Sequence, residues 1–162
     1  MNVLITGGAG YLGSVLAKKL LEKKYNVTVF DNFFYNQKSL SDICHYKNFD
    51  VVNEDVRDIQ VFKSYIKKND IIIPLAALVG APICQKYKKL AIDVNETQIK
   101  NLFKEISKNQ AIILPVTNSG YGIGKKDKFC DENTPLNPIS HYGITKVNAE
   151  RIALENGNAV SL

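Results

Sequence analysis

"TGGAGYLGS", residues 6–14, is the stretch that decides the fold. Three of its four glycines, Gly7, Gly10 and Gly13, follow an apolar strand pattern and precede a helical one. In that position the first glycine allows a tight turn, the second lets backbone approach a pyrophosphate, and the third permits close helix–strand packing. The start of the helix adds unpaired N–H groups and the positive end of its dipole. The stretch therefore predicts a phosphate-binding loop rather than a plain glycine turn.

Strand and helix patterns alternate along the rest of the chain. The strand patterns are 2–8, 26–32, 49–56, 70–77, 111–117 and 158–162, and the helical ones are 10–24, 58–68, 89–108 and 139–156. We expect the first helix to bury Leu12, Val15, Leu16, Leu20 and Leu21 on one face. Asn156-Gly157 predicts the end of the last helix. The alternation predicts one α/β domain, a Rossmann-type doubly wound parallel sheet with helices on both faces.

The composition excludes several classes of protein. The 162 residues are 45% hydrophobic and contain no run of 18 apolar residues, which favours a single globular domain without a membrane span. The N-terminus lacks the layout of a signal peptide, so we expect a cytoplasmic protein with its three cysteines as free thiols. His45 and His141 show no metal-ligand spacing. The net charge of +5 comes from scattered lysines, which suit solvated helices or an anionic small substrate better than a nucleic acid.

Asp31, at the end of the second strand pattern, lies 18 residues after Gly13. This is close to the spacing of the carboxylate that binds adenosine ribose hydroxyls in dinucleotide-binding proteins. The segment after it, which begins with Asn32, offers no arginine or lysine for the 2′-phosphate of NADP. We therefore predict NAD as the cofactor, the alternative being a solvated aspartate at a strand end.

Two further strand ends are expected to face this cofactor. After the third strand, Asp55 can accept from an adenine amino group and Val56 can pack on the ring. Asp55 can instead cap the next helix, although Asp58 is the better cap candidate. After the fourth strand, the small residues of 75–82 can run beside the cofactor or can simply pack closely.

The fifth strand leads into "PVTNSGYGIG", which places Thr117, Ser119 and Tyr121 at the cleft where strand ends open. No helical pattern follows its glycines, so they are expected to shape a turn, and residues 125–138 are predicted to be loop. Tyr142 and Lys146 then share one face of the last helix.

This tyrosine–lysine pair is either a catalytic acid/base or part of an ordinary amphipathic helix. An ammonium near a phenol lowers its pKa, which favours a base that works near neutral pH. The hydroxyl of Thr117 can meet Tyr142 if the helix packs beside the fifth strand, whereas His141 is expected to point elsewhere.

Together these segments resemble the extended short-chain dehydrogenase/reductase family of NAD-dependent sugar epimerases and dehydratases. "TGGAGYLG" is similar to its TGxxGxxG loop, and "EDVRD" to its GDxRD segment, with Glu54 replacing a glycine. "VNETQIKNL" resembles its NxxGTxNLL helix, with Asn95 in the asparagine position and Gln98 as a departure. "VTNSGYG" and "HYGITK" resemble its S[ST]xxxYG loop and YxxxK pair, so the resemblance covers the whole chain.

The resemblance implies a chemistry like that of UDP-glucose 4-epimerase on a nucleotide-diphosphate sugar. Tyr142 would be the general base, Thr117 would assist it, and Lys146 would hold the nicotinamide ribose. The implied NAD contacts are Gly7, Gly10, Tyr11, Leu12, Gly13, Asp31, Asn32, Asp55, Val56, Leu75, Ala76, Ala77, Asn95, Tyr142 and Lys146. Ser119 would contact the substrate, and Asn118 and Ser119 replace the acids of sugar dehydratases, which favours an epimerase or a reductase.

The family also implies an assembly and a second domain. Its members dimerise through the helices that would carry Asn95 and Tyr142 here. They continue into a substrate-binding domain, so residues 1–162 are expected to be the NAD-binding and catalytic part of a truncated protein. The alternative is a non-catalytic NAD-binding fragment or a subunit that needs a partner chain.

Overall fold

The computed structural model describes residues 1–124 and 129–162 of the chain, so the first part of the predicted loop 125–138 lies outside the described residues. The strands are β1 (Asn2–Thr6), β2 (Asn26–Asp31), β3 (Phe49–Asn53), β4 (Ile71–Pro74), β5 (Ala111–Leu114) and β6 (Ala159–Ser161). The α-helices are α1 (Tyr11–Glu22), α2 (Ile59–Ile66), α3 (Ala81–Lys86), α4 (Lys88–Ile92), α5 (Gln98–Glu105) and α6 (His141–Asn156). Short 3₁₀ turns cover Ser41–Ile43 and Asn118–Tyr121, and a π-helical turn, Asp93–Thr97, joins α4 to α5.

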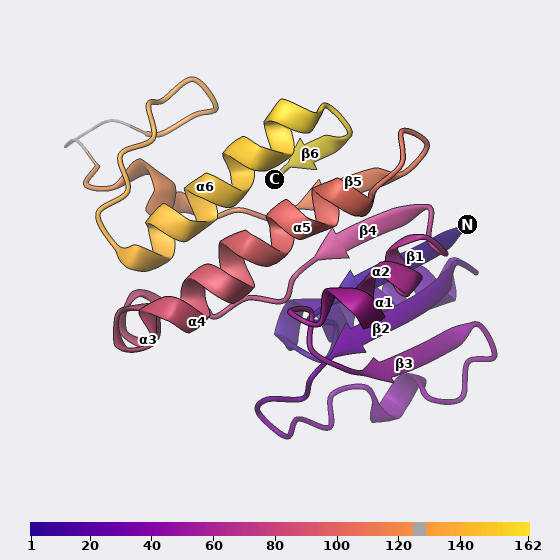
Figure 1. Ribbon diagram of the computed structural model, residues 1–162. Coiled ribbons are helices and arrows are strands. Elements are labelled where there is room, and N and C mark those ends of the chain that lie inside the picture. The colour runs from indigo at the N-terminus through magenta and orange to yellow at the C-terminus, as the bar shows by residue number, and fades with distance from the viewer. Residues whose placement is uncertain (125–128) are drawn as a thin grey trace.

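The six strands form one parallel sheet in the order β3-β2-β1-β4-β5-β6 (Figure 1). The chain starts at the centre with β1, moves outward through β2 and β3, and then crosses to the other side of β1. The strand order therefore reverses between the neighbouring strands β1 and β4, at their carboxyl ends. The predicted Rossmann-type doubly wound sheet is confirmed, and ligands of such sheets bind at this switch point.

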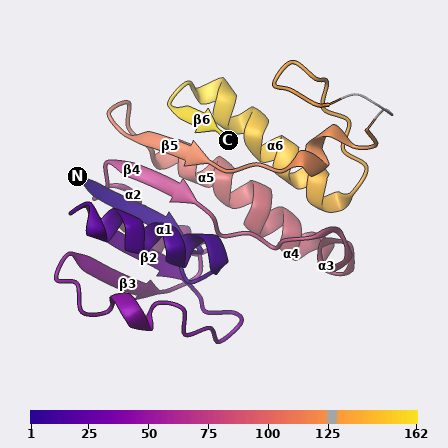
Figure 2. The ribbon, with the colours of Figure 1, turned by 180° about the vertical axis from the view of Figure 1, so that it is seen from behind.

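Helices cover both faces of the sheet because successive side chains of each strand point to opposite sides. From β1, Leu4 packs into a core with α2, α5 and α6, while Val3 and Ile5 pack into a second core with α1. Figure 1 shows α5 and α6 in front of the sheet, and Figure 2 shows α1 on the opposite face. Two cores thus hold the carboxyl ends of the strands in a fixed arrangement.

The buried face of α1 agrees with the prediction in part, since Leu21 is buried and Leu16 and Leu20 pack against the core beside it. The residues that α1 buries are Gly13, Ala17 and Leu21, whereas Leu12 and Val15 are 54% and 52% exposed. A Cβ on Gly13 would lie 2.5 Å from the Cα of Gly8, so only small residues fit where the helix leaves the loop. The helix therefore turns its small residues to the sheet and leaves Leu12 free to line a cavity.

Local signals at two helix ends were predicted correctly. Asp58 caps α2, since its carboxylate accepts from the backbone N–H groups of Gln60 and Val61. Gly157 ends α6 in the left-handed conformation, with a φ of 73°. In contrast, helix α3 was not predicted, and the helix expected over 89–108 contains the π-helical turn.

The strands β3, β4 and β5 end before their predicted carboxyl ends. The predicted strands 49–56 and 70–77 stop at Asn53 and Pro74, and the residues after each of them line the cavity described below. After β4 the apolar residues 75–77 continued the strand pattern, but they line the cavity.

Candidate functional site

The glycine loop joins β1 to α1 at the switch point of the sheet. Gly7 has a φ of 66°, and its N–H donates to the carbonyl of Phe30 at 2.9 Å. A Cβ on Gly7 would lie 2.6 Å from the backbone nitrogen of Ala76, so a larger residue is excluded. Gly10 is the N-cap of α1 without a side chain to occupy the free N–H groups. The loop therefore leaves the N-terminus of a twelve-residue helix open to an anion.

Asp31 fastens this loop to the end of β2. Its Oδ2 accepts from the N–H of Ala9 at 3.0 Å, and its Oδ1 accepts from the N–H of Phe33 at 2.8 Å. The residue is 8% exposed and lines the cavity beside the glycine loop. The carboxylate thus positions the loop in addition to facing the cavity, a role that its spacing in the sequence did not reveal.

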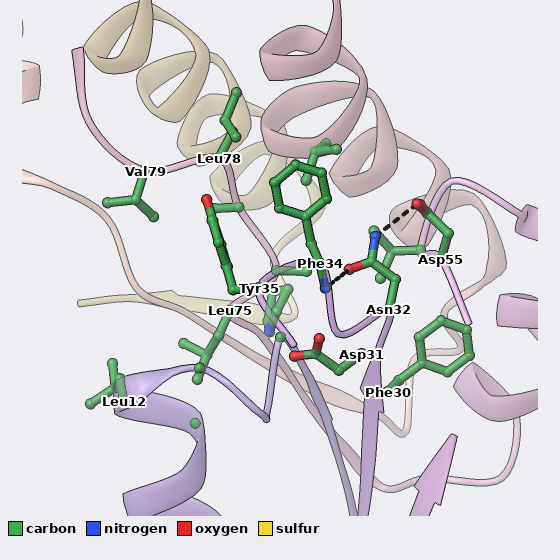
Figure 3. Close-up of a pocket in the computed structure, with 18 of the residues that line it drawn as sticks. Leu12, Phe30, Asp31, Asn32, Phe34, Tyr35, Asp55, Leu75, Leu78 and Val79 are labelled. Carbon is green, nitrogen blue, oxygen red and sulfur yellow. Dashed lines mark hydrogen bonds between the residues drawn. The ribbon is translucent and has the colours of Figure 1, made fainter. Parts of the chain in front are cut away.

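A cavity of about 510 Å³ opens where β1, β2, β4 and β5 end, and its size falls in the range of about 300–1,000 Å³ that is usual for small-molecule sites. Figure 3 shows part of its lining. The predicted cofactor contacts that line it are Gly7, Gly10, Tyr11, Leu12, Gly13, Asp31, Asn32, Asp55, Val56, Leu75, Ala76, Ala77, Tyr142 and Lys146. Fourteen predicted residues from distant parts of the sequence thus line the same cavity.

Asp55 lies at the cavity wall, but the donors of the chain itself occupy its carboxylate. Arg57 donates to it through its backbone N–H, its Nε and its Nη2, and Asn32 donates through Nδ2 at 3.0 Å. The hydrogen bonds from Arg57, above all, lower the pKa of Asp55 to about 2. A carboxylate has about four acceptor positions, so a ligand amino group has to displace one of these donors.

Asn95 lies behind the cavity wall and not among its lining residues. It sits in the π-helical turn, is 2% exposed, and accepts from the N–H of Leu78 while donating to the carbonyl of the same residue. Its amide also donates to Thr145 Oγ1 of α6 at 3.3 Å. Asn95 therefore holds the loop after β4 against α6, which is a supporting position for the cavity.

Helix α6 brings Tyr142 and Lys146 to the same cavity. Ser140 caps the helix by accepting from the N–H of Gly143 at 3.0 Å. A Cβ on Gly143 would lie 2.7 Å from the carbonyl oxygen of Ser119, so this glycine lets α6 approach the turn after β5. The close approach places the Thr117 hydroxyl within hydrogen-bonding reach of the Tyr142 phenol, although Thr117 and Ser119 do not line the cavity.

The electrostatics of this pair correct the expectation from the sequence. Burial raises the pKa of Tyr142, a hydrogen bond from Thr117 opposes the rise, and the buried thiol of Cys84 adds to it. Lys146 is not among the groups that shift the Tyr142 pKa, and its ammonium donates to the carbonyl of Pro115 at 2.8 Å. Burial also lowers the pKa of Lys146 itself.

The remaining candidates lie away from this chemistry. His141 points elsewhere as predicted, with its Nε2 3.1 Å from the carbonyl of Lys88. Over residues 1–124 and 129–162, no group of three or more histidines, cysteines or acids is placed to hold a metal ion. Within the same described ranges, no helix is long and apolar enough to cross a membrane.

Sequence reasoning missed part of the cavity wall. Phe34, Tyr35 and Gln37 line it from the loop after β2, and Arg57 lines it beside Asp55. The signal was present in "NFFYNQ", since two adjacent aromatic residues follow directly on the acid that ends β2.

The fold and the site define a dinucleotide-binding Rossmann domain that presents a tyrosine–lysine pair to its cavity. The model of the NAD dependent epimerase/dehydratase family matches residues 3–161, and the chain belongs to this family.

Curated relatives agree with this assignment. The chain is 28% identical to a putative UDP-glucose 4-epimerase of Methanocaldococcus jannaschii, over 95% of this chain and 50% of the relative. It is 30% identical to an uncharacterized UDP-glucose epimerase of Bacillus subtilis, over 94% and 50% of the two chains.

A solved structure, the dTDP-glucose 4,6-dehydratase of Bacillus anthracis in complex with NAD, is 25% identical with a TM-score of 0.87. The match covers 99% of this chain and 53% of that structure. The chain thus spans about half the length of the relatives that it matches.

Proposed function

We propose that this chain is the NAD-binding and catalytic half of a nucleotide-sugar epimerase. The observation that carries the proposal is that Tyr142 and Lys146 line the same cavity as the glycine loop and Asp31. Relatives named as UDP-glucose epimerases support the epimerase assignment. The NAD complex of a structural neighbour supports the choice of cofactor.

The residues present fit NAD. A Cβ at Gly7 or Gly13 would clash with the backbone of Ala76 or Gly8, so the tight loop requires glycine at both positions, and the open N-terminus of α1 suits a pyrophosphate. Asp31 offers a carboxylate to ribose hydroxyls, and no basic side chain stands in the loop directly after it to hold a 2′-phosphate. A cofactor can lie along the side of the cavity that is lined by the apolar residues Leu75, Ala76 and Ala77.

NAD, when bound, accepts a hydride from the sugar carbon and returns it, which is the redox part of an epimerisation. The chain supplies the proton transfer and the positioning. Tyr142 takes the proton of the sugar hydroxyl, and Thr117 stabilises the phenolate by hydrogen bonding. Lys146, which lines the same cavity, would hold the nicotinamide ribose and tune Tyr142.

A second candidate is an NAD-binding subunit that requires a partner for the sugar. It is favoured by the observation that the chain matches only about half the length of its relatives. A dehydratase fits less well, because Asn118 and Ser119 offer no carboxylate after Thr117. A homodimer through the helices bearing Asn95 and Tyr142, and a cytoplasmic location suited to three unpaired cysteines, remain predictions.

The test is interconversion of UDP-glucose and UDP-galactose by the purified chain with NAD. The epimerase proposal predicts turnover that Tyr142→Phe abolishes and that Tyr87→Phe, an exposed tyrosine between α3 and α4, leaves unchanged. NAD binding without turnover would contradict the epimerase proposal for this chain and support the second candidate, an NAD-binding subunit that requires a partner. Turnover that survives Tyr142→Phe would contradict the assignment of the base.

A further inference from the structure

The loops that lead into strands β2 to β6 carry the net charge of the chain. They are residues 23–25, 44–48, 67–70, 106–110 and 157–158. Their charged side chains are six lysines and one acid, namely Lys23, Lys24, Lys47, Lys67, Lys68, Lys108 and Asp70. Of the 21 basic and 16 acidic side chains of the chain, fifteen of each therefore lie elsewhere, so these loops account for the net charge of +5.

All five loops lie at one edge of the molecule. Because every strand of the sheet is parallel to its neighbours, each of these loops enters its strand at the amino end, and we call this side the amino edge. In Figure 2 the arrows of β1, β4 and β5 point away from this edge, and N marks the start of β1 there. The cavity opens at the other edge, where the strands end. Lysines that are scattered in the sequence are thus gathered on the side opposite the cavity.

Side-chain amides tie the loops of the amino edge to one another. Each amide donates a hydrogen bond from one loop or strand start to a neighbouring one. The bonds run from Asn48 to Tyr25, from Asn26 to Asn2, from Asn2 to Lys68, from Gln110 to Asn69 and from Asn158 to Ser107. All except the bond from Asn26 end on a backbone carbonyl. The lysines therefore stand on loops that are held together as one surface.

The charges of this edge are not compensated by the chain itself. The six lysines are exposed, and none of them forms a salt bridge in the part of the chain that the structure describes. Asp70, the one acid of these loops, accepts from a backbone N–H at 2.7 Å. Glu22 and Glu105, at the ends of α1 and α5, each pair with another lysine of the chain. Like charges gathered in this way create a positive potential that attracts anions.

The helix dipole explains only part of this arrangement. Lys23 and Lys67 are the C-cap residues of α1 and α2, where a cation offsets the negative end of the dipole. Lys47 and Lys108 stand beyond the last turn of the preceding helical element, and the dipole effect falls off within that turn. Helix stability therefore does not account for the whole group of lysines.

We propose that the amino edge is an interaction surface for the anionic headgroups of a phospholipid membrane. The edge runs across six strands that lie about 4.8 Å apart, so its lysines meet a broad surface. Arginine is the residue that nucleic-acid recognition favours, and both arginines of the chain, Arg57 and Arg151, lie outside these loops. A membrane on this side leaves the cavity open to solvent. The association is electrostatic and reversible, and it does not depend on the proposed binding of NAD.

The experiment is sedimentation of the purified chain with vesicles of phosphatidylcholine that contain about a third phosphatidylserine, which gives them a negative surface. The wild type binds these vesicles at low salt and does not bind vesicles of phosphatidylcholine alone. Raising the ionic strength to about 1 M shortens the Debye length to about 3 Å and releases the protein, a result that depends on no variant. Replacing Lys23, Lys67 and Lys68 together by glutamine weakens binding by about ten- to a hundredfold.

The matched control replaces Lys86, Lys88 and Lys89 by glutamine, so that the two triple variants have the same net charge. These lysines are exposed on α3 and α4, which Figure 2 shows on the side of the molecule away from N. The control keeps its affinity within about threefold, because charges farther than a Debye length of about 10 Å from the membrane are screened.

Three results would overturn the proposal. They are equal weakening by the two triple variants, equal binding to vesicles with and without phosphatidylserine, and no binding of the wild type at low salt. Displacement of the chain from the vesicles by duplex DNA at an equal concentration of phosphate would also overturn it, and would assign the amino edge to a nucleic acid.

Discussion

The ammonium of Lys146 donates to the backbone carbonyl of Pro115 across 2.8 Å, from the second turn of α6 to the residue that follows β5. The lysine is 8% exposed, and its burial lowers its pKa. This bond fixes α6 beside the end of the sheet and keeps the ammonium near the tyrosine of the same helix face.

Lys146→Met is predicted to separate stability from catalysis. The change removes a desolvated charge but leaves the Pro115 carbonyl without its donor, so the free energy of unfolding stays within about 1 kcal/mol of the wild type. Epimerisation falls by about a hundredfold, because the ammonium no longer supports the phenolate. Denaturant unfolding and the turnover assay check the two values, with exposed Lys18→Met as the control. A loss of several kcal/mol would mean that Lys146 is mainly structural.

Asn95→Leu is predicted to destabilise the fold by about 2–4 kcal/mol, because the N–H and the carbonyl of Leu78 lose their buried partner. Asn109→Ala, at an exposed turn position, stays within about 0.5 kcal/mol. Urea unfolding followed by circular dichroism measures both variants. Equal stability of Asn95→Leu and the wild type would show that the loop after β4 does not depend on this amide.

Gly13→Ala tests the close approach of α1 to the glycine loop. The added Cβ would meet the Cα of Gly8 at 2.5 Å and the carbonyl of Gly7 at 2.7 Å, so overpacking is expected to cost about 1–3 kcal/mol. Gly124→Ala adds the same group where no atom lies within 4 Å. Thermal unfolding that shifts equally in both variants would be at odds with this packing.

The ion pair of Asp55 and Arg57 predicts that the free energy of unfolding decreases at low pH. The pKa of Asp55 falls from 3.8 to about 2 on folding, so its contribution is complete above the unfolded value and is lost as pH decreases through about 2. Partial exposure of both groups reduces this contribution to about 1 kcal/mol. Asp55→Asn should therefore lower stability at neutral pH and match the wild type near pH 2.

The control for this pH dependence is Asp42→Asn, an exposed acid in the 3₁₀ turn after β2. Denaturant unfolding of both variants at neutral pH and near pH 2 then gives the pH-dependent part that belongs to the Asp55 ion pair. An offset for Asp55→Asn that is the same at every pH would rule out the ion pair as its source.

The fold and most of the cavity were predictable because their signals are local. The glycine loop, the helix cap at Asp58 and the helix end at Gly157 each depend on the backbone conformation and hydrogen bonds of a few neighbouring residues. The parallel order of strands followed from the alternation of strand and helix.

Tertiary contacts account for what the sequence did not reveal. The buried face of α1 depends on how closely Gly13 approaches Gly8, and the pKa of Tyr142 depends on burial among distant elements. The aromatic turn was missed because Phe33 adopts a positive φ of 50°, which is uncommon for a bulky residue.

The central claim, that the cavity beside Asp31 holds NAD, is tested most directly by titrating the chain with NAD and NADP in a calorimeter. Asp31 is nearly buried and already fixed by Ala9 and Phe33, so it cannot turn away from a 2′-phosphate. The account predicts one NAD bound per chain and an affinity for NADP that is weaker by about tenfold or more, because like charges would meet. Failure to bind NAD, or equal affinity for the two dinucleotides, would contradict it.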